Sequence, residues 1–83
     1  MNWSQMRVSH LRNAARLLEN RGAAAIGDEL DAAWSCLSWV QGEHASYDIE
    51  RGISHLENQL ATVLAFAAQM KTYADWRESV GWL

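Results

Sequence analysis

The sequence predicts an all-α protein, organised as a three-helix antiparallel bundle-like subunit that assembles into a helical oligomer. Apolar residues recur every three or four positions along three successive segments, which is the spacing of a helix face and not the alternation of a strand. Proline is absent, and no repeat or low-complexity segment divides the 83 residues. We therefore expect one helical domain over residues 1–83, with a thin core because so short a chain buries a modest share of its surface.

The first helix is expected over roughly residues 3–20. Its apolar line is short and consists of Leu11, Ala14 and Leu18, with Trp3 or Val8 joining at the start. Gly22 follows this line, and glycine commonly ends a helix because it adopts the left-handed conformation without strain. The chain is therefore expected to turn at Gly22.

The second helix is expected over roughly residues 24–41. Its apolar face is formed by Ile26, Leu30, Ala33, Leu37 and Val40. Trp34 widens this face, and Gly42 follows the last apolar position. Gly42 is therefore predicted to end the second helix.

The third helix is expected over roughly residues 48–73, because its apolar positions form the longest continuous seam in the chain. The seam consists of Ile49, Ile53, Leu56, Leu60, Val63, Ala67 and Met70. Asp48 or Ser46 is predicted to cap the N-terminus of this helix, where Glu50 interacts favourably with the helix dipole. An apolar C-terminal tail is expected over residues 74–83.

The chain has more apolar and aromatic area than a thin core can hide, since 49% of its residues are hydrophobic and five are tryptophans. Such an excess is typical of a partner surface. The seam of the third helix would be buried best against a second copy, so we expect a homo-oligomer. The tail offers a second contact surface, whose candidate interface residues are Trp76, Val80, Trp82 and Leu83.

Charge is unevenly distributed along the chain. Arginines gather in the first helix at Arg7, Arg12, Arg16 and Arg21, whereas residues 28–50 carry six carboxylates. The two regions either complement each other, within a bundle or between subunits, or form an anion-binding arginine stripe beside an acidic site. The net charge of −3 and the confinement of the basic residues to one helix argue against binding to double-stranded DNA.

No segment is long and apolar enough to predict a membrane protein. The longest run without a charge is "NQLATVLAFAAQM", residues 58–70, whereas a spanning helix needs about 20 apolar residues. The chain does not open with the pattern of a secretion signal, and a single cysteine, Cys36, gives no disulfide framework. We expect a cytoplasmic protein.

The stretch "GEHASYDIERGISHLENQ", residues 42–59, concentrates carboxylates and histidines around two glycines. Helix capping by Asp48 and Glu50 is one explanation. The other is a magnesium site, because Mg²⁺ prefers carboxylate oxygens and retains several waters. The candidate metal ligands are Glu29, Asp31, Glu43, Asp48 and Glu50, and the spacing does not identify which of them converge. Glu43, Asp48 and Glu50 would hold the ion if the protein is an enzyme. The histidines and Cys36 lack the spacing of a zinc site.

Two pieces of the sequence, "AAWSCLSWVQGE" and "DIERGISHL", resemble a phage-associated family of dATP/dGTP pyrophosphohydrolase-like proteins, related to the all-α MazG nucleotide pyrophosphatases. The resemblance covers roughly residues 32–70. The matching positions are Trp39, Gly42 and Glu43, followed by Asp48, Glu50, Gly52, His55 and Leu56. The chain departs from the family pattern at Ile49, where a proline is usual, and at Asn58, where a second histidine is usual.

The resemblance implies a small phage-type protein that handles nucleotides and, if it is an enzyme, uses Mg²⁺. We expect it to bind a nucleotide or nucleotide-like signal without turnover, as a sponge or inhibitor of host defence. The candidate ligand-binding residues are Arg7, Arg12 and Arg16 for phosphate, Trp39 and Tyr47 for stacking a base, and His55. One alternative is a Mg²⁺-dependent dNTP pyrophosphohydrolase, and the other is an inhibitor that binds a host protein complex, such as an anti-CRISPR.

Overall fold

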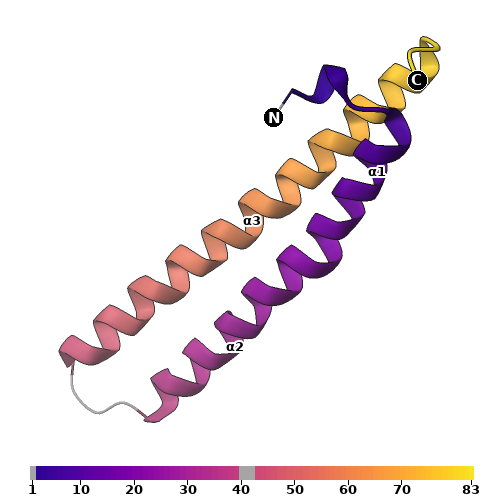
Figure 1. Ribbon diagram of the computed structural model, residues 1–83. Coiled ribbons are helices and arrows are strands. Elements are labelled where there is room, and N and C mark those ends of the chain that lie inside the picture. Colours follow the sequence, from indigo (N-terminus) through magenta and orange to yellow (C-terminus); the bar gives the residue numbers. More distant parts are fainter. Residues whose placement is uncertain (1, 40–42) are drawn as a thin grey trace.

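The computed structural model describes residues 2–39 and 43–83, with the side chains of 43–45 excepted. These residues form two long antiparallel helical rods side by side, without a strand (Figure 1). The first rod consists of α1 (Val8–Leu17), the π-helix η2 (Leu18–Gly22) and α2 (Ala23–Trp39). The second rod is α3 (Glu43–Ser79). The fold is therefore a helical hairpin measuring 59 × 18 × 16 Å.

The all-α prediction is confirmed, but the three-helix subunit is wrong, because the first two expected helices are one rod of 32 residues. The expected turn at Gly22 is replaced by η2, where the N–H of Ala23 donates to the carbonyl of Leu18, five residues earlier. A π-helical turn absorbs one extra residue without breaking the helix. Alanines 23–25 then continue the rod readily because alanine has the highest helix propensity.

The register of the apolar residues explains why the rod needs this extra residue. The positions that face α3 are Val8, Leu11, Ala15, Leu18, Gly22, Ile26, Leu30, Ala33 and Leu37. Three consecutive steps of four residues run from Leu18 to Leu30, which would rotate the apolar line off the contact face of a regular α-helix. The π-helix restores the register, so one rod keeps contact with α3 along its length.

The third helix begins earlier and ends later than the sequence predicted. α3 starts at Glu43 and includes Ser46, Asp48 and Glu50, so none of these residues is the N-cap or a first-turn carboxylate as expected. It continues to Ser79, which leaves only residues 80–83 of the predicted tail outside the helix. Val40 and Gly42, to which the sequence assigned a core position and a helix end, lie outside the described residues.

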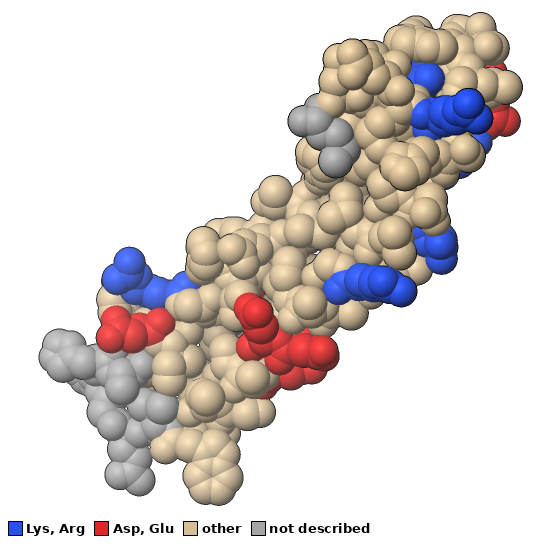
Figure 2. All heavy atoms as spheres, in the orientation of Figure 1, with Lys and Arg blue, Asp and Glu red and all other residues tan. Residues whose placement is uncertain are grey.

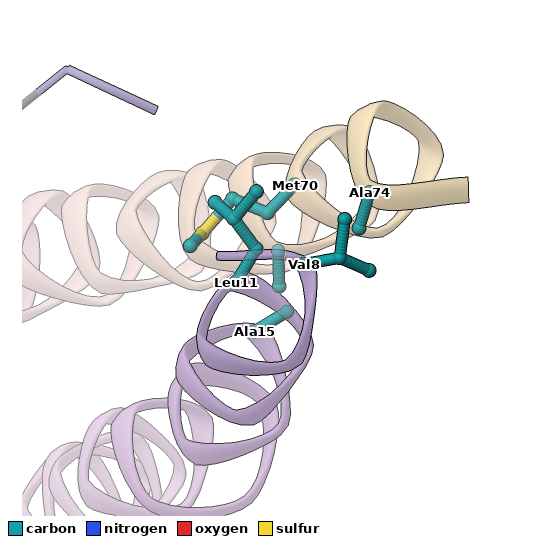
Figure 3. Close-up of a cluster of buried hydrophobic side chains, with 6 residues drawn as sticks. Val8, Leu11, Ala15, Met70 and Ala74 are labelled. Atoms are coloured by element: carbon teal, nitrogen blue, oxygen red, sulfur yellow. The ribbon is translucent and has the colours of Figure 1, made fainter. Parts of the chain in front are cut away.

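The fully buried core lies at one end of the hairpin. Figure 3 shows Val8, Leu11 and Ala15 of α1 packed against Met70 and Ala74 of α3, and Ala67 completes the cluster. The N-terminal segment, which includes the 3₁₀-helix η1 (Trp3–Gln5), adds Trp3 and Met6 to its border. The chain termini both lie at this end (Figure 1).

The other half of the hairpin is much less covered. Among the described residues α2 has no buried side chain, and its seam, from Ile26 to Leu37, is half-buried. The predicted seam of α3 is confirmed as the face toward the first rod, with Ile53 buried and Leu56 and Leu60 half-buried. Two helices alone cannot enclose the side chains between them, because each seam keeps two open flanks.

Candidate functional site

Arg77, on the last turns of α3, organises the end of the hairpin where the termini meet. Its side chain is only 2% exposed. The guanidinium donates to the carbonyl oxygens of Trp3, at 3.1 Å, and Met6, and its Nε donates to the carbonyl of Trp82, also at 3.1 Å. It also lies 4.3 Å from the ring centroid of Trp82, a favourable cation–π geometry. One buried cation thus fixes the N-terminal segment and the C-terminal tail around α3.

A chain of aromatic rings runs along α3 beside Arg77. The ring of Trp3 lies 5.1 Å from that of Phe66, edge to face, and 5.9 Å from that of Tyr73. Tyr73 stacks on Trp76 at 6.0 Å, and Trp76 meets Trp82 edge to face at 6.2 Å. Aromatic pairs at these separations attract each other beyond their buried area. Each ring of this chain therefore packs against at least one neighbouring ring.

Part of this aromatic chain stays exposed. We call the exposed apolar side chains at this end the aromatic end surface; it comprises Phe66, Trp76, Val80, Trp82 and Leu83, which are between 44% and 68% exposed. A shallow apolar recess lies next to it and is lined by residues that include Gln69, Thr72 and Trp76. The surface combines large apolar area with fixed side-chain geometry.

The structure gathers the four interface residues expected from the sequence, Trp76, Val80, Trp82 and Leu83, at this one end. Sequence reasoning missed Phe66 and the supporting residues Trp3, Tyr73 and Arg77. Phe66, Tyr73 and Trp76 follow at steps of seven and three on α3, a helical row beside the seam that could have been recognised. The contacts of Trp3 with α3 have no local sequence signal, because they join opposite ends of the chain.

The arginines expected to bind phosphate lie on α1 or just before it, at the same end of the hairpin. Arg7 and Arg12 line a recess with Ser9 and Glu78. Arg12 donates to Asp75 at 2.8 Å and also forms an ion pair with Glu78.

These contacts change the environment of Arg12, whereas Arg16 has a local partner. The hydrogen bonds to Asp75 and then Glu78 raise the pKa of Arg12 above its ordinary value. An arginine is already protonated at any pH at which proteins are studied, so the charge of Arg12 does not change with pH. Arg16 donates to the side-chain oxygen of Asn13 at 2.7 Å.

The aromatic residues expected to stack a base lie at the opposite end of the hairpin. Trp39 ends α2 and Tyr47 lies near the start of α3, beside Arg51 (Figure 1). At 1.5 Å per residue, Trp39 is about 40 Å along the rod from Arg12. One subunit therefore does not bring the arginines and these aromatic rings to one ligand. His55, farther along α3, contacts Gln59 at 3.2 Å and lines a separate recess with Ile26.

The candidate metal ligands Glu43, Asp48 and Glu50 all lie in the first turns of α3. Asp48 and Glu50 have exposed side chains, whereas the side chain of Glu43 is outside the described part. Among the described residues, no group of three or more His, Cys, Asp and Glu side chains lies close enough to hold one ion. In the same part of the chain, no helix is long and apolar enough to cross a membrane.

A comparison with family models, curated proteins and solved structures found no match to this chain. The arguments about its function therefore rest on the arrangement of its own residues.

Proposed function

We propose that this chain is a protein-binding module that contacts its partner through the aromatic end surface. The observation that carries the proposal is the exposure of Trp76, Val80, Trp82 and Leu83 on a segment that Arg77 and the aromatic chain hold in place. Large apolar side chains at a chain end are ordinarily frayed. Here they are ordered and exposed together, which suits a contact surface.

The ring contacts within this surface favour tight binding. Trp76 is 52% exposed, yet its ring is held between Tyr73 and Trp82. A side chain that is already ordered loses little conformational entropy on binding. Tryptophan is also among the residues that most often contribute a large share of binding energy at interfaces.

The chemistry of the surface defines its partner as a protein with a complementary apolar groove or helix face. The exposed indole rings offer N–H donors at the margin of an apolar patch, so the partner would combine apolar side chains with a few acceptor oxygens. A component of a host complex is the class of partner that the inhibitor interpretation implies.

The test is affinity capture with a matched set of variants, followed by reconstitution with the purified captured protein. Trp76→Ala together with Val80→Ser should weaken binding about 30-fold or more, because a buried tryptophan anchor contributes roughly 2 kcal/mol or more. Trp39→Ala is the matched control, because Trp39 is 86% exposed at the opposite end. Equal binding by both variants, with unchanged circular dichroism spectra, would refute the proposal.

A second candidate function is nucleotide binding without turnover, favoured by the recess that Arg7, Ser9 and Arg12 line. Arginine binds phosphate oxygens through paired hydrogen bonds. A phosphate at this recess would have to compete with Asp75 and Glu78 for Arg12.

Thermal shift with a panel of dNTPs and cyclic nucleotides tests this binding. A rise in melting temperature that Arg7→Ala abolishes supports it. Normal stabilisation of an Arg7→Ala and Arg12→Ala double variant by every nucleotide that stabilises the parent protein rules out this recess.

The Mg²⁺-dependent pyrophosphohydrolase suggested by the family resemblance is tested by the fate of the nucleotide. An enzyme would return a dNTP as its monophosphate with release of pyrophosphate, whereas a sponge would return it intact. Glu50→Gln should abolish that release if Glu50 is a metal ligand. Release that survives this substitution would contradict the assignment of Glu50.

A further inference from the structure

Among the described residues, the ion pairs between the two rods all lie on one broad side of the hairpin. Arg12 pairs with Asp75 and Glu78, and Lys71 pairs with Glu19 at 2.6 Å. On both rods these residues come one position after a residue of the apolar seam, so they form a row along the seam. We call this side the ion-pair face.

The same rows continue past the ion pairs onto the less covered half of the hairpin. On the first rod the row comprises Arg12, Arg16, Glu19, Ala23, Gly27, Asp31, Trp34 and Ser38. On α3 it comprises Ser54, Glu57, Ala61, Leu64, Ala68, Lys71, Asp75 and Glu78. Trp34 is 54% exposed and Leu64 is 43% exposed. The middle of the ion-pair face is therefore apolar and built largely from small side chains.

The two halves of this face differ in charge. The half toward the chain termini carries three cations, Arg12, Arg16 and Lys71, and three carboxylates, Glu19, Asp75 and Glu78, whereas the other half carries only carboxylates. Arg16 and Lys71 lie toward the end where the termini meet, and Asp31 and Glu57 lie toward the other end. Within residues 2–39 and 46–83, neither Asp31 nor Glu57 takes part in an ion pair. Along the first rod as a whole, Figure 2 shows blue basic side chains over α1 and red acidic ones over α2.

The centre of the face lies at Ala23 and Leu64. A Cβ placed on Gly22 would lie 3.6 Å from Val63, so these two residues lie at the same level along the hairpin. The residues that follow them, Ala23 on the first rod and Leu64 on α3, belong to the ion-pair face. Ala23 lies at the middle of the rod that runs from Val8 to Trp39. Two hairpins turned about this level would therefore overlap along their whole length.

We propose that the ion-pair face binds a second copy of this chain in antiparallel orientation, about a two-fold axis that crosses the rods at Ala23 and Leu64. Each rod then lies on its own symmetry mate. Arg16 lies seven residues before Ala23 and Asp31 lies eight residues after it, so Arg16 comes opposite the partner's Asp31 to within one residue. Lys71 and Glu57 each lie seven residues from Leu64, so Lys71 faces the partner's Glu57. Leu64 itself packs on the partner's Leu64.

Charge decides the orientation. Every antiparallel contact of this kind occurs twice, which places opposite charges across the interface at four positions. A parallel arrangement would instead lay the acidic half, with Asp31 and Glu57, on the acidic half of the other copy. Like charges held together in this way repel each other and disfavour that arrangement.

The area of the face is sufficient for a stable dimer. A face of 59 × 18 Å amounts to on the order of 1,000 Å² per subunit, whereas stable protein interfaces bury about 800 Å² per partner. The dimer also supplies part of what the α2 half of the hairpin lacks, because two hairpins stacked face to face form a four-helix arrangement that covers one of the two open flanks of each seam.

A charge exchange tested by sedimentation equilibrium is the first experiment. Arg16→Asp and Asp31→Arg should each raise the dimer dissociation constant about tenfold or more, because each places like charges in contact twice. The double exchange should restore the parent value to within about threefold. Arg16 and Asp31 lie about 22 Å apart along one rod, so the restoration must come from a second copy.

Cysteine cross-linking tests the position of the axis. In a Cys36→Ser background, Leu64→Cys should give a covalent dimer on mild oxidation, since each side chain meets its own copy at a two-fold axis. Thr62→Cys is the matched control, because Thr62 is exposed beside His55 on the other side of α3. A monomer at every concentration, no rescue by the charge exchange, or a covalent dimer from Thr62→Cys alone would overturn the proposal.

None of these substitutions touches the aromatic end surface. Loss of the dimer and loss of partner binding are therefore separate outcomes. A protein that dimerises normally but captures no partner retains the second-copy proposal and loses the proposed function. A protein that captures its partner but does not dimerise retains the proposed function and refutes the dimer.

Discussion

Replacing Arg77 with methionine tests whether one buried cation holds the two chain ends on α3. The substitution keeps much of the volume of the side chain but removes its hydrogen bonds to the carbonyl oxygens of Trp3, Met6 and Trp82. A hydrogen bond to a charged group contributes roughly 1.5–3 kcal/mol. The bonds share one donor group and are not additive, and water can reach carbonyls near the surface. We therefore expect a loss of about 3 kcal/mol in the free energy of unfolding.

Thermal denaturation followed by circular dichroism measures this loss. In a domain of this size 1 kcal/mol shifts the melting temperature by about 4–8 °C, so Arg77→Met should lower it by about 12–24 °C. Arg51→Met is the matched control, because Arg51 is exposed and lies 5.8 Å from the ring of Tyr47. The two variants must be compared at one protein concentration, since self-association would stabilise both.

A second measurement separates the local role of Arg77 from a general loss of stability. Without Arg77 the N-terminal segment should be cleaved by protease at temperatures where α3 is still folded, because the segment loses its anchor. The reasoning would be refuted if Arg77→Met melted within about 3 °C of the parent protein, which corresponds to less than 1 kcal/mol, and if its N-terminal segment resisted protease as well as that of the parent.

Leu11→Ala should destabilise the chain by about 2–5 kcal/mol in chemical denaturation, because Leu11 is completely buried in the small core; a loss below about 1 kcal/mol would show that this core contributes little. Gly81→Ala should cost roughly 1–2 kcal/mol in the same assay, since Gly81 has a φ of +74°. Gly52→Ala is the control and should be neutral or stabilising, because Gly52 is at an exposed helical position with nothing within 4 Å of the new Cβ. Cys36 is exposed, so it should react with a thiol reagent in the native protein as fast as after unfolding, and slow reaction at high protein concentration would indicate that a contact covers it.

Much of the fold could be predicted from the apolar spacing alone. Within the described residues, the seams of all three expected helices are the faces that pack in the hairpin, because a helix face is a local property of the sequence. The turn at Gly22 was wrong for a specific reason. Gly22 does not have a positive φ, and a Cβ there would make only an ordinary contact with Val63. The glycine was read as a helix end, but the π-helix passes through it.

The site was less predictable because its main contacts join distant parts of the chain. The sequence indicated that Trp76, Val80, Trp82 and Leu83 form a contact surface, since apolar bulk at a chain end is locally visible. It did not indicate that Arg77 would be buried, because its partners are backbone carbonyls that any residue provides. The separation of Arg12 from Trp39 also follows only from the absence of a turn between them.

The two proposed surfaces lie on different parts of the hairpin, and this arrangement has a consequence for binding. The ion-pair face runs along one side of both rods, whereas the aromatic end surface lies at the end where the termini meet (Figure 1). An antiparallel dimer would place its two aromatic end surfaces at opposite ends of an assembly about as long as one hairpin, 59 Å. Two such surfaces could bind two copies of one partner, or two sites on a larger complex, and the second contact would then form at high effective concentration. A weak single contact could thus become a strong double one, which gives a chain this small a physical reason to dimerise in antiparallel and not in parallel orientation.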